Sequence, residues 1–398
     1  MKWKWMLCAV LMAGLLCGCG AKEAEEPPVQ EEPGAMEPVA ADSAQALLAK
    51  LSTEEKVGQL FLVRPDALDL SLTPQQLDDA NGPGLTQVDA EHLDTLKTYP
   101  VGGFVLFGKN LQDPDQLAQL MTGLSRGSQV PLLFAVDEEG GTVSRIANSG
   151  GFDVPQFSDM AAIGASGDPA KAKEVGLTIG GYLRDLGFQW DFAPVADVNT
   201  NPDNPVIGSR AFSSSPEEAA MMISAVVEGF HEGGVACALK HFPGHGDTAQ
   251  DSHKGYASTD KTWQEMLTCE MYPFQAGMAA GADAVMVGHI TTPNATQDGL
   301  PASLSREMIS EKLRGELRFQ RVVVTDSLSM EAITDAYAPG QAALMALEAG
   351  ADVLLMPESL SEAYDAILAA VQDGTISQER LDQSVLRILQ LKEKYGLI

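Results

Sequence analysis

Ionisable side chains recur where apolar, strand-like runs of the sequence come to an end. The residues that follow or close such runs are Asp137 after LLFAV, Asp197 after FAPVA, Lys240 and His241 after VACAL, His289 after VMVG, and Asp326 after VVVT. A carboxylate held rigidly at a strand end can act as a nucleophile, and a nearby imidazole can donate and accept protons. The alternative for Asp326 is a structural acid that caps the next helix. The repetition at five strand ends favours chemistry over solvation alone.

The segment KHFPGHGDTAQDSHKG at positions 240–255 contains three of the six histidines of the chain. Pro243, Gly244 and Gly246 exclude a regular helix, so the HxxxH spacing does not place two metal ligands on one face. We therefore expect no metal site in this loop. In an extended segment Asp251 and His253 project to the same side, where the carboxylate tunes the imidazole as a general acid/base near neutral pH. The alternative is an ordinary surface pair.

A second acid-rich strand end reads VDEEGG at positions 136–141, with Arg145 just beyond it. Three consecutive acids cannot all face one point, so a divalent-ion site is not expected there. A single inward Asp137 that accepts hydrogen bonds from a hydroxylated ligand is the simpler interpretation. Arg210 lies in a loop rich in Pro and Asn, where it either holds a polar substrate or forms a surface ion pair.

The elements that must position these residues alternate between strands and helices. Nearly all-apolar runs predict strands at 57–63, 101–107, 132–136, 190–195, 236–240, 284–288, 322–325 and 353–356. Segments with helical periodicity lie between them, and a last one at 378–395 carries an apolar stripe typical of packing. Apolar strands joined by helical crossovers indicate a parallel sheet covered on both faces. Eight such units predict an α/β fold of the (β/α)8 barrel type, and an open doubly wound sheet is the alternative.

The first twenty residues, MKWKWMLCAVLMAGLLCGCG, predict a secretory signal, because the apolar run of about eleven residues is too short to span a bilayer. The sequence Leu16-Cys17-Gly18-Cys19 resembles a bacterial lipobox, which implies cleavage before Cys19 and lipid attachment to it. A plain secretory signal is the alternative. Residues 19–42, rich in Glu and Pro, form an expected solvated tether. The expected division is signal peptide 1–18, lipidated tether 19–42 and catalytic barrel 43–398.

Composition restricts the partners. The chain has 398 residues, of which 26 are Lys or Arg and 55 are Asp or Glu, giving a net charge of −29. Neutralising phosphates requires clustered cations, so nucleic acid is not an expected partner, and membrane contact is expected only through the lipid anchor. Cys237 and Cys269 do not make a disulfide framework and are expected to be small core residues.

Taken together, the stretches AVDEEGGTVSR, DFAPVADVNTNPDNPVIGSRAF, KHFPGHGDTAQDSHKG and VVVTDSLSM resemble glycoside hydrolase family three, in its bacterial β-N-acetylglucosaminidase (β-hexosaminidase) branch. The resemblance covers about residues 47–398. It implies that Asp326 is the nucleophile and that His253, paired with Asp251, is the general acid/base. The positions that it implies for substrate binding are Asp137, Arg145, Arg210, Lys240, His241 and His289. It implies no cofactor.

The resemblance predicts an extracytoplasmic enzyme, anchored by lipid in the cell envelope, that removes terminal β-linked N-acetylhexosamine from peptidoglycan fragments with retention. Many members of the family carry a second α/β domain from which some take a Glu as acid/base. Because the sequence stops at Ile398, we do not expect that arrangement here. Phosphorolysis of the same substrates is one alternative, since a histidine would not repel phosphate. A carbohydrate-binding lipoprotein without catalysis is the other.

Overall fold

Eight parallel strands form the centre of the fold, which a computed structural model describes over residues 43–251 and 257–398. They pair in the order β11-β9-β7-β6-β3-β2-β1-β12, and a parallel bridge between Val324 and Val353 connects the two ends of this order. The ring is a nearly closed (β/α)8 barrel, which confirms the predicted fold class. The strands are β1 (Phe61–Val63), β2 (Gly103–Leu106), β3 (Leu133–Val136), β6 (Trp190–Asp191), β7 (Ala236–Phe242), β9 (Ala284–Val287), β11 (Val322–Thr325) and β12 (Leu354–Leu355).

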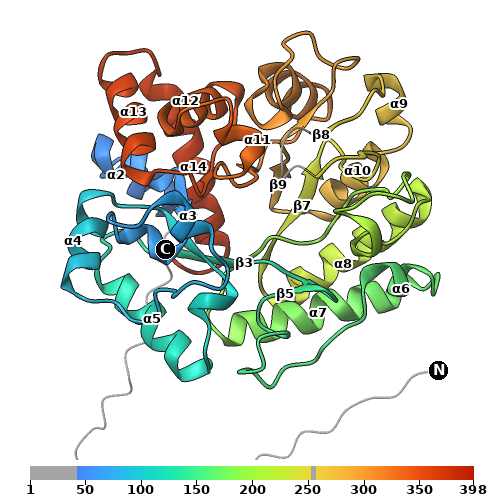
Figure 1. Cartoon of the computed structure of the whole chain (residues 1–398), viewed down its shortest axis with the longest axis horizontal. Coiled ribbons are helices and arrows are strands. Elements are labelled where there is room, and N and C mark those ends of the chain that lie inside the picture. The colour runs from blue at the N-terminus through green and yellow to red at the C-terminus, as the bar shows by residue number, and fades with distance from the viewer. Residues whose placement is uncertain (1–42, 252–256) are drawn as a thin grey trace, which may run out of the picture. The chain divides into compact units, whose positions relative to one another are not determined.

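Helices surround the strands, as Figure 1 shows. They are α1 (Ser43–Leu48), α2 (Thr53–Gln59), α3 (Pro74–Asp78), α4 (Ala90–Thr98), α5 (Pro114–Arg126), α6 (Met160–Gly164), α7 (Pro169–Asp185), α8 (Pro216–Gly233), α9 (Trp263–Leu267), α10 (Met271–Ala280), α11 (Glu331–Thr334), α12 (Pro339–Ala349), α13 (Leu360–Gln372) and α14 (Gln378–Lys394). A π-helix, η6 (Glu307–Glu316), precedes β11, and short 3-10 turns are η1 (Pro65–Leu68), η2 (Gly108–Asn110), η3 (Gly208–Arg210) and η5 (Ala302–Leu304). Among the described residues, two small two-stranded sheets, described below, lie outside the barrel sheet.

Local sequence signals fix the ends of the crossover helices. Helices α5, α7 and α8 each begin with Pro in the first turn, preceded by a side chain that accepts a backbone N–H: Asp113, Asp168 and Ser215, respectively. Helix α8 ends at Gly234, whose φ of 91° lies in the left-handed region that glycine adopts without steric cost. These signals explain where the crossover helices between the predicted strands begin and end.

The first predicted strand, 57–63, is partly wrong. Residues Val57–Gln59 belong to α2, and the strand itself is β1, which begins only at Phe61. Ser52 and Glu55 form a capping box in which each side chain accepts the other's backbone N–H, and this starts the helix upstream of the apolar run. Because Val57 is buried on the helix, its apolar character did not distinguish helix from strand.

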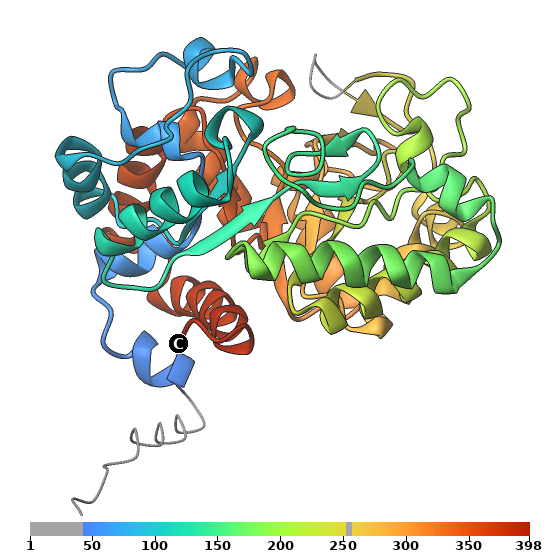
Figure 2. The ribbon, with the colours of Figure 1, turned by 90° about the horizontal axis from the view of Figure 1, so that it is seen from below.

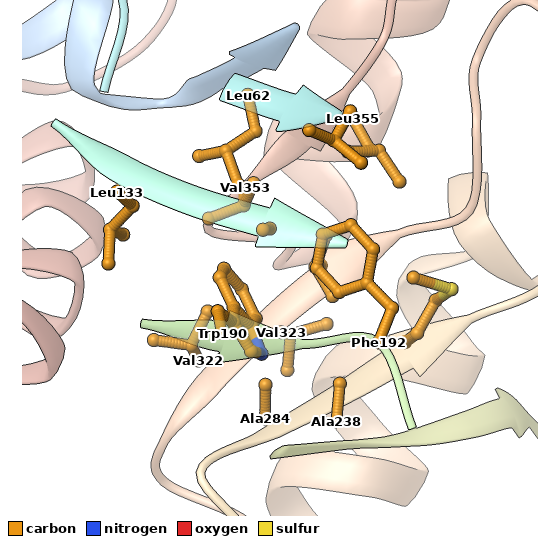
Figure 3. Packing of buried hydrophobic residues seen from close by; sticks show 14 of the residues in the cluster. Leu62, Leu133, Trp190, Phe192, Ala238, Ala284, Val322, Val323, Val353 and Leu355 are labelled. Atoms are coloured by element: carbon orange, nitrogen blue, oxygen red, sulfur yellow. The ribbon is translucent and has the colours of Figure 1, made fainter. Parts of the chain in front are cut away.

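The core is continuous from the strands to the surrounding helices. Trp190 and Phe192, two residues apart on the β6 segment, project to the same side of it, as Figure 3 shows. Their rings meet edge to face with centroids 5.1 Å apart, and both are fully buried. Side chains of alternate residues on neighbouring strands fill the remaining space, with small residues such as Ala238 and Ala284 facing the large rings.

Helix α14 closes the end of the barrel at which the strands begin. It contacts α1, and Figure 2 shows these two helices side by side. Asp352, which lies just before β12, is fully buried. Its carboxylate forms ion pairs with Arg314 Nη2 at 2.7 Å and with Arg387 Nη1 at 3.0 Å. Burial raises the pKa of this carboxyl, but the neighbouring guanidinium groups outweigh it and hold the pKa below its usual range.

The segments assigned to a signal peptide (1–18) and to a lipidated tether (19–42) lie outside the described residues. The described residues lie in one compact unit, Asp42–Ile398. Among the described helices, none has both the length and the apolar character that crossing a bilayer requires.

We expect Asp352→Asn to lower the free energy of unfolding by about 3–5 kcal/mol, because the buried guanidinium groups lose their counter-charge. Urea unfolding at neutral pH measures this. The matched control is Asp94→Asn, which removes an exposed pair with Lys97 and should cost about 0–1 kcal/mol. Equal losses in the two variants would contradict the structural role of Asp352.

Candidate active site

A cavity of about 870 Å³ lies at the end of the barrel at which the strands finish. Each barrel strand, or the residue that follows it, contributes to the lining: Arg64, Phe107, Asp137, Phe192, Lys240, Met286, Asp326 and Leu355, in chain order. Loops add side chains around this ring, among them Glu139, Arg145, Arg210 and His241. The volume is in the range of small-molecule sites, and the position is the one at which barrels of this type carry chemistry.

Lys240 of β7 is the cation on which the polar side of the cavity is built. Its Nζ lies 2.8 Å from Asp137 Oδ1 and 2.6 Å from Glu139 Oε1, and the residue is 2% exposed. Burial lowers the pKa of the ammonium, but the two carboxylates outweigh burial and raise it above its ordinary value. Lys240 therefore stays charged and connects β7 to the end of β3.

Arg210 of η3 completes this cluster. Its Nε and Nη2 donate to the two carboxylate oxygens of Glu139 at 2.8 and 2.7 Å, and its Nη1 donates to the Val206 carbonyl at 3.1 Å. Burial alone raises the pKa of Glu139, but the charges of Lys240 and Arg210 outweigh burial and hold the pKa far below its usual value. The carboxyl group therefore stays ionised. Arg210 thus forms a largely buried ion pair with Glu139 and not the surface ion pair that was one of the two expectations from the sequence.

Strands β4 (Glu138–Gly140) and β5 (Val143–Ser144) form a small hairpin. Arg145 directly follows β5, and it lines the cavity. Its guanidinium carbon lies 5.6 Å from the centre of the Phe107 ring, and its Nη2 lies 3.8 Å from Asp137 Oδ2. The side chain is 37% exposed. Stacking on Phe107 orients the guanidinium plane while leaving it accessible to a ligand.

His241 also lines the cavity, and Asp197 fixes its orientation. The Nδ1 of His241 lies 2.8 Å from Asp197 Oδ2, and Asp197 is fully buried. Burial raises the pKa of Asp197, but the neighbouring imidazoles outweigh it and lower the pKa. Because the carboxylate accepts from Nδ1, Nε2 is the ring nitrogen through which His241 can contact a ligand.

Asp326 follows β11 directly and lines the same cavity. Its backbone N–H donates to the Val287 carbonyl of β9 at 2.8 Å, and its Oδ1 accepts the Ser327 N–H at 2.8 Å. The backbone of Asp326 is therefore held by the neighbouring strand, and its carboxylate by the next peptide. A group held in this way is suited to act from a fixed position.

The loop that carries the predicted acid/base begins on a rigid first arm. Asp197 Oδ1 accepts the His245 N–H at 2.6 Å, and Asn204 Nδ2 donates to the His245 and Thr248 carbonyls at 2.8 and 2.9 Å. Gly246 passes so close to the preceding loop that a Cβ would lie 1.9 Å from the Val198 carbonyl oxygen. Only glycine fits this close approach.

The second arm of the loop is tied to the first. Asp247 accepts the hydroxyls of Thr200 at 2.9 Å and Thr259 at 2.8 Å, and Lys261 Nζ lies 3.2 Å from it. Lys261 also pairs with the buried Glu270. The second arm then joins β8 (Ala257–Ser258), which pairs with β10 (Ile290–Thr291). Residues on both sides of positions 252–256 are thus fixed to the barrel.

The structure brings six of the predicted site residues to the cavity: Asp137, Arg145, Arg210, Lys240, His241 and Asp326. His253 lies outside the described residues, and Asp251 is described but is not among the residues that line the cavity. The predicted Asp251–His253 pairing and the roles of all these residues stay predictions.

His289 occupies a different place from the one predicted for it. It is fully buried and is not among the described lining residues of the cavity. Its ring nitrogens lie 2.7 Å from Ser303 Oγ and 2.7 Å from the Ser327 carbonyl. His289 therefore fixes the backbone at Ser327, the residue that follows Asp326. Its described contacts are those of a positioning residue.

Sequence reasoning missed Glu139. The interpretation that Asp137 alone faces inward is wrong, because Asp137 and Glu139 both reach Lys240 while Glu138 points away. Glu138 accepts the N–H groups of Ile146 and Ala147 at 2.8 and 2.9 Å and so shapes the turn after Arg145. Alternation along an extended segment puts residues two apart on one side, and this signal was present in the sequence.

The Glycosyl hydrolase family 3 N terminal domain matches residues 52–391 of the chain. The chain belongs to glycosyl hydrolase family 3. This confirms the family predicted from the four sequence stretches. The β-hexosaminidase of Stenotrophomonas maltophilia is 37% identical over 288 residues, which cover 71% of this chain and 84% of that protein. β-Hexosaminidase A of Pseudoalteromonas piscicida is 36% identical over 339 residues, 78% of this chain.

Among solved structures, a family 3 β-N-acetylglucosaminidase from Paenibacillus sp. str. FPU-7 aligns with 87% of this chain at 40% identity and a TM-score of 0.77. The match spans 63% of that chain, and the match to β-hexosaminidase A spans 56% of that protein. The family 3 barrel described here thus corresponds to part of these two longer proteins and to most of the Stenotrophomonas one.

We expect Glu139→Gln to lower the free energy of unfolding by about 3–5 kcal/mol at neutral pH, because two buried cations lose a shared carboxylate. Since the native pKa of Glu139 is depressed, its stabilisation is complete above the ordinary glutamate pKa of about 4.3 and is lost as pH falls toward the native value. Urea unfolding of wild type and variant at a series of pH values measures this. Glu348→Gln, an exposed change on α12, is the control; a wild-type advantage that does not shrink in acid would contradict the assignment.

Proposed function

We propose that the chain is an exo-acting, retaining β-N-acetylglucosaminidase that hydrolyses terminal β-linked N-acetylhexosamine, with peptidoglycan fragments as its source of substrate. The observation that carries this proposal is Asp326, fixed at a strand end in a cavity whose other polar side chains come from Asp137, Lys240 and their partners. Names of the similar family members, β-hexosaminidase and β-N-acetylglucosaminidase, support the substrate class.

In the proposed first step an oxygen of Asp326 attacks the anomeric carbon while His253 gives its proton to the leaving oxygen. A covalent glycosyl-enzyme forms, and the leaving group departs as an alcohol. In the second step His253, now neutral, removes a proton from water, which attacks the same carbon and releases Asp326. The sugar leaves with its original configuration after two inversions.

The two roles place different demands on the chain. The attacking carboxylate benefits from the fixed backbone between β9 and β11. The proton donor must serve both the leaving oxygen and the incoming water, and a loop between two anchored arms suits that task. Asp247 and Lys261 connect these arms, and neither is among the described residues that line the cavity.

The remaining polar side chains suit recognition of sugar hydroxyls. Asp137 supplies acceptors, while Lys240, Arg145 and the Nε2 of His241 supply donors. The carboxylates of Asp137 and Glu139 already hold Lys240, so the ligand meets groups whose positions are set before it binds. Such preorganisation lowers the cost of ordering side chains on binding.

With an aryl β-N-acetylglucosaminide, we expect the wild-type protein to release the phenol and Asp326→Ala to be inactive, because no nucleophile remains. The control is Asp335→Ala, an exposed aspartate of the same loop region, which should retain full activity. The assay is run with and without inorganic phosphate. Inactive wild-type protein would overturn the proposal, and a phosphate-dependent sugar 1-phosphate product would replace hydrolysis by phosphorolysis.

His253→Ala should reduce turnover by about 10²–10⁴-fold for poor leaving groups and much less for an activated aryl leaving group, which departs without a proton. Azide needs no general base, so it should restore the second step and give a β-glycosyl azide. Leaving-group series and product analysis by NMR measure both effects. If the variant loses activity equally with every leaving group and azide has no effect, His253 is not the acid/base.

We also propose that Cys19 is lipidated and anchors the protein in the cell envelope, outside the cytoplasm. The support is the order of a positive start, an apolar run of signal-peptide length and Leu16-Cys17-Gly18-Cys19. Metabolic labelling with an alkyne fatty acid should label the wild-type protein and Cys17→Ala but not Cys19→Ala. Labelling of all three proteins, or of none, would refute the anchor without affecting the proposed activity.

A further inference from the structure

A second cluster of reactive side chains lies at the end of the barrel opposite the cavity. Cys237 is near the start of β7, Asp283 immediately precedes β9, and His231 is near the end of α8. Strands β7 and β9 are paired neighbours in the sheet, so the backbone fixes the positions of Cys237 and Asp283 relative to each other. One ligand atom from each residue (thiol sulfur, carboxylate oxygen, imidazole nitrogen) lies within 4.8 Å of the other two.

The distances within this cluster are close to those of a metal site. His231 Nε2 lies 2.9 Å from Asp283 Oδ2 and 4.0 Å from Cys237 Sγ. Ligand bonds of about 2.0–2.3 Å in a tetrahedral zinc site put its ligand atoms about 3.3–3.7 Å apart. Shifts of well under 1 Å per side chain, by this estimate, would convert the cluster to that geometry.

We propose that His231 Nε2, Cys237 Sγ and Asp283 Oδ2 bind a divalent transition-metal ion of the zinc class. A sulfur, a nitrogen and an oxygen ligand suit zinc or cobalt and do not suit calcium or magnesium, which prefer oxygen alone. On binding, the Cys237 sulfur–hydrogen bond breaks and its proton passes to solvent, the His231 Nε2 proton is lost from Nε2 as the ring changes to its Nδ1–H form, and sulfur–metal and nitrogen–metal bonds form. No electron is transferred, and a water molecule takes the fourth position.

The surroundings of Asp283 already hold it as an anion. Lys394 Nζ pairs with Oδ1, and Tyr395 Oη donates to Oδ2 at 2.8 Å. Burial raises the pKa of Asp283, but the hydrogen bond from His231 and the Lys394 charge outweigh it and lower the pKa. Lys394 can stay on Oδ1 while Oδ2 binds the metal, as outer partners of ligating carboxylates commonly do.

Access and charge set limits on the site. Cys237 and Asp283 are buried, whereas the side chains of His231 and Lys394 are 24% and 47% exposed, so the ion would enter past them. Burial raises the pKa of the Cys237 thiol, and a metal ion supplies the positive charge that thiolate formation needs there. Lys394 and Arg321 add positive charge nearby, so we expect weaker binding than at structural sites with several thiolates.

Cobalt(II) added to the chelator-stripped full chain tests the proposal through its spectrum. We expect a thiolate-to-cobalt charge-transfer band and intense d–d bands at one equivalent, both bleached by zinc. Cys237→Ser should remove the charge-transfer band, and the matched change Cys269→Ser, at the other described cysteine, should preserve it. Far-UV circular dichroism checks that each variant is folded.

His231→Gln provides a second variant, because this partly exposed residue can be changed with little effect on folding. It should weaken cobalt binding by at least about 10-fold, the lower end of what even outer partners of a metal site contribute. No charge-transfer band in the wild-type protein, or the same band in Cys237→Ser, would overturn the proposal. So would an unchanged cobalt affinity in His231→Gln.

Discussion

An ammonium group buried as deeply as that of Lys240 is stable only when carboxylates surround it, and this requirement organises the cavity. Lys240 belongs to β7, Asp137 and Glu139 to the end of β3 and the hairpin beyond it, and Arg210 to a loop from a third part of the chain. No two of these segments can move apart without leaving a charge unpaired in a poorly solvated place, which costs several kcal/mol, about 3–5 by comparison with other buried pairs. The cluster thus makes the carboxyl-terminal end of the barrel rigid on the side where a ligand would be recognised.

The side of the cavity that carries Asp326 is also rigid. Asp326 is held by β9 through its backbone and by Ser327 through its carboxylate, and His289 holds the Ser327 carbonyl in turn. The loop after His245 is anchored through its described arms, by Asp197 and Asn204 on the first arm and by Thr259 and Lys261 on the second. In the proposed two-step reaction a carboxylate held in this way suits the attack on the sugar, because attack needs a fixed position.

Much of this arrangement was predictable from sequence, for identifiable reasons. Apolar runs ending in Asp137, Lys240 and Asp326 predicted both the barrel and the edge at which these residues meet, because parallel strands bring their carboxyl ends together. The helical start of the 57–63 run was not recognised, since a capping box at Ser52 and Glu55 competes with an apolar pattern that suits either element. The network of Asp247, Thr200 and Lys261 could not be predicted, because it joins loops whose relative positions no local pattern specifies.

Helix α14 brings cations to two buried carboxylates at the end of the barrel opposite the cavity. At the end where strands begin, this helix supplies Arg387 to Asp352 and Lys394 to Asp283, and it buries Lys392, whose Nζ lies 2.6 Å from Gln59 Oε1. Burial lowers the pKa of Lys392 to about 7, so this lysine becomes neutral at little cost where Asp352 and Asp283 keep paired charges. Together with Arg314 of η6 and His231 of α8, this helix satisfies the buried charges at this end and also packs its apolar face on the barrel. At the opposite end the Lys240 cluster satisfies its charges internally, and Arg145 and Asp326 remain to line the cavity, so each end is stabilised by its own set of buried ion pairs.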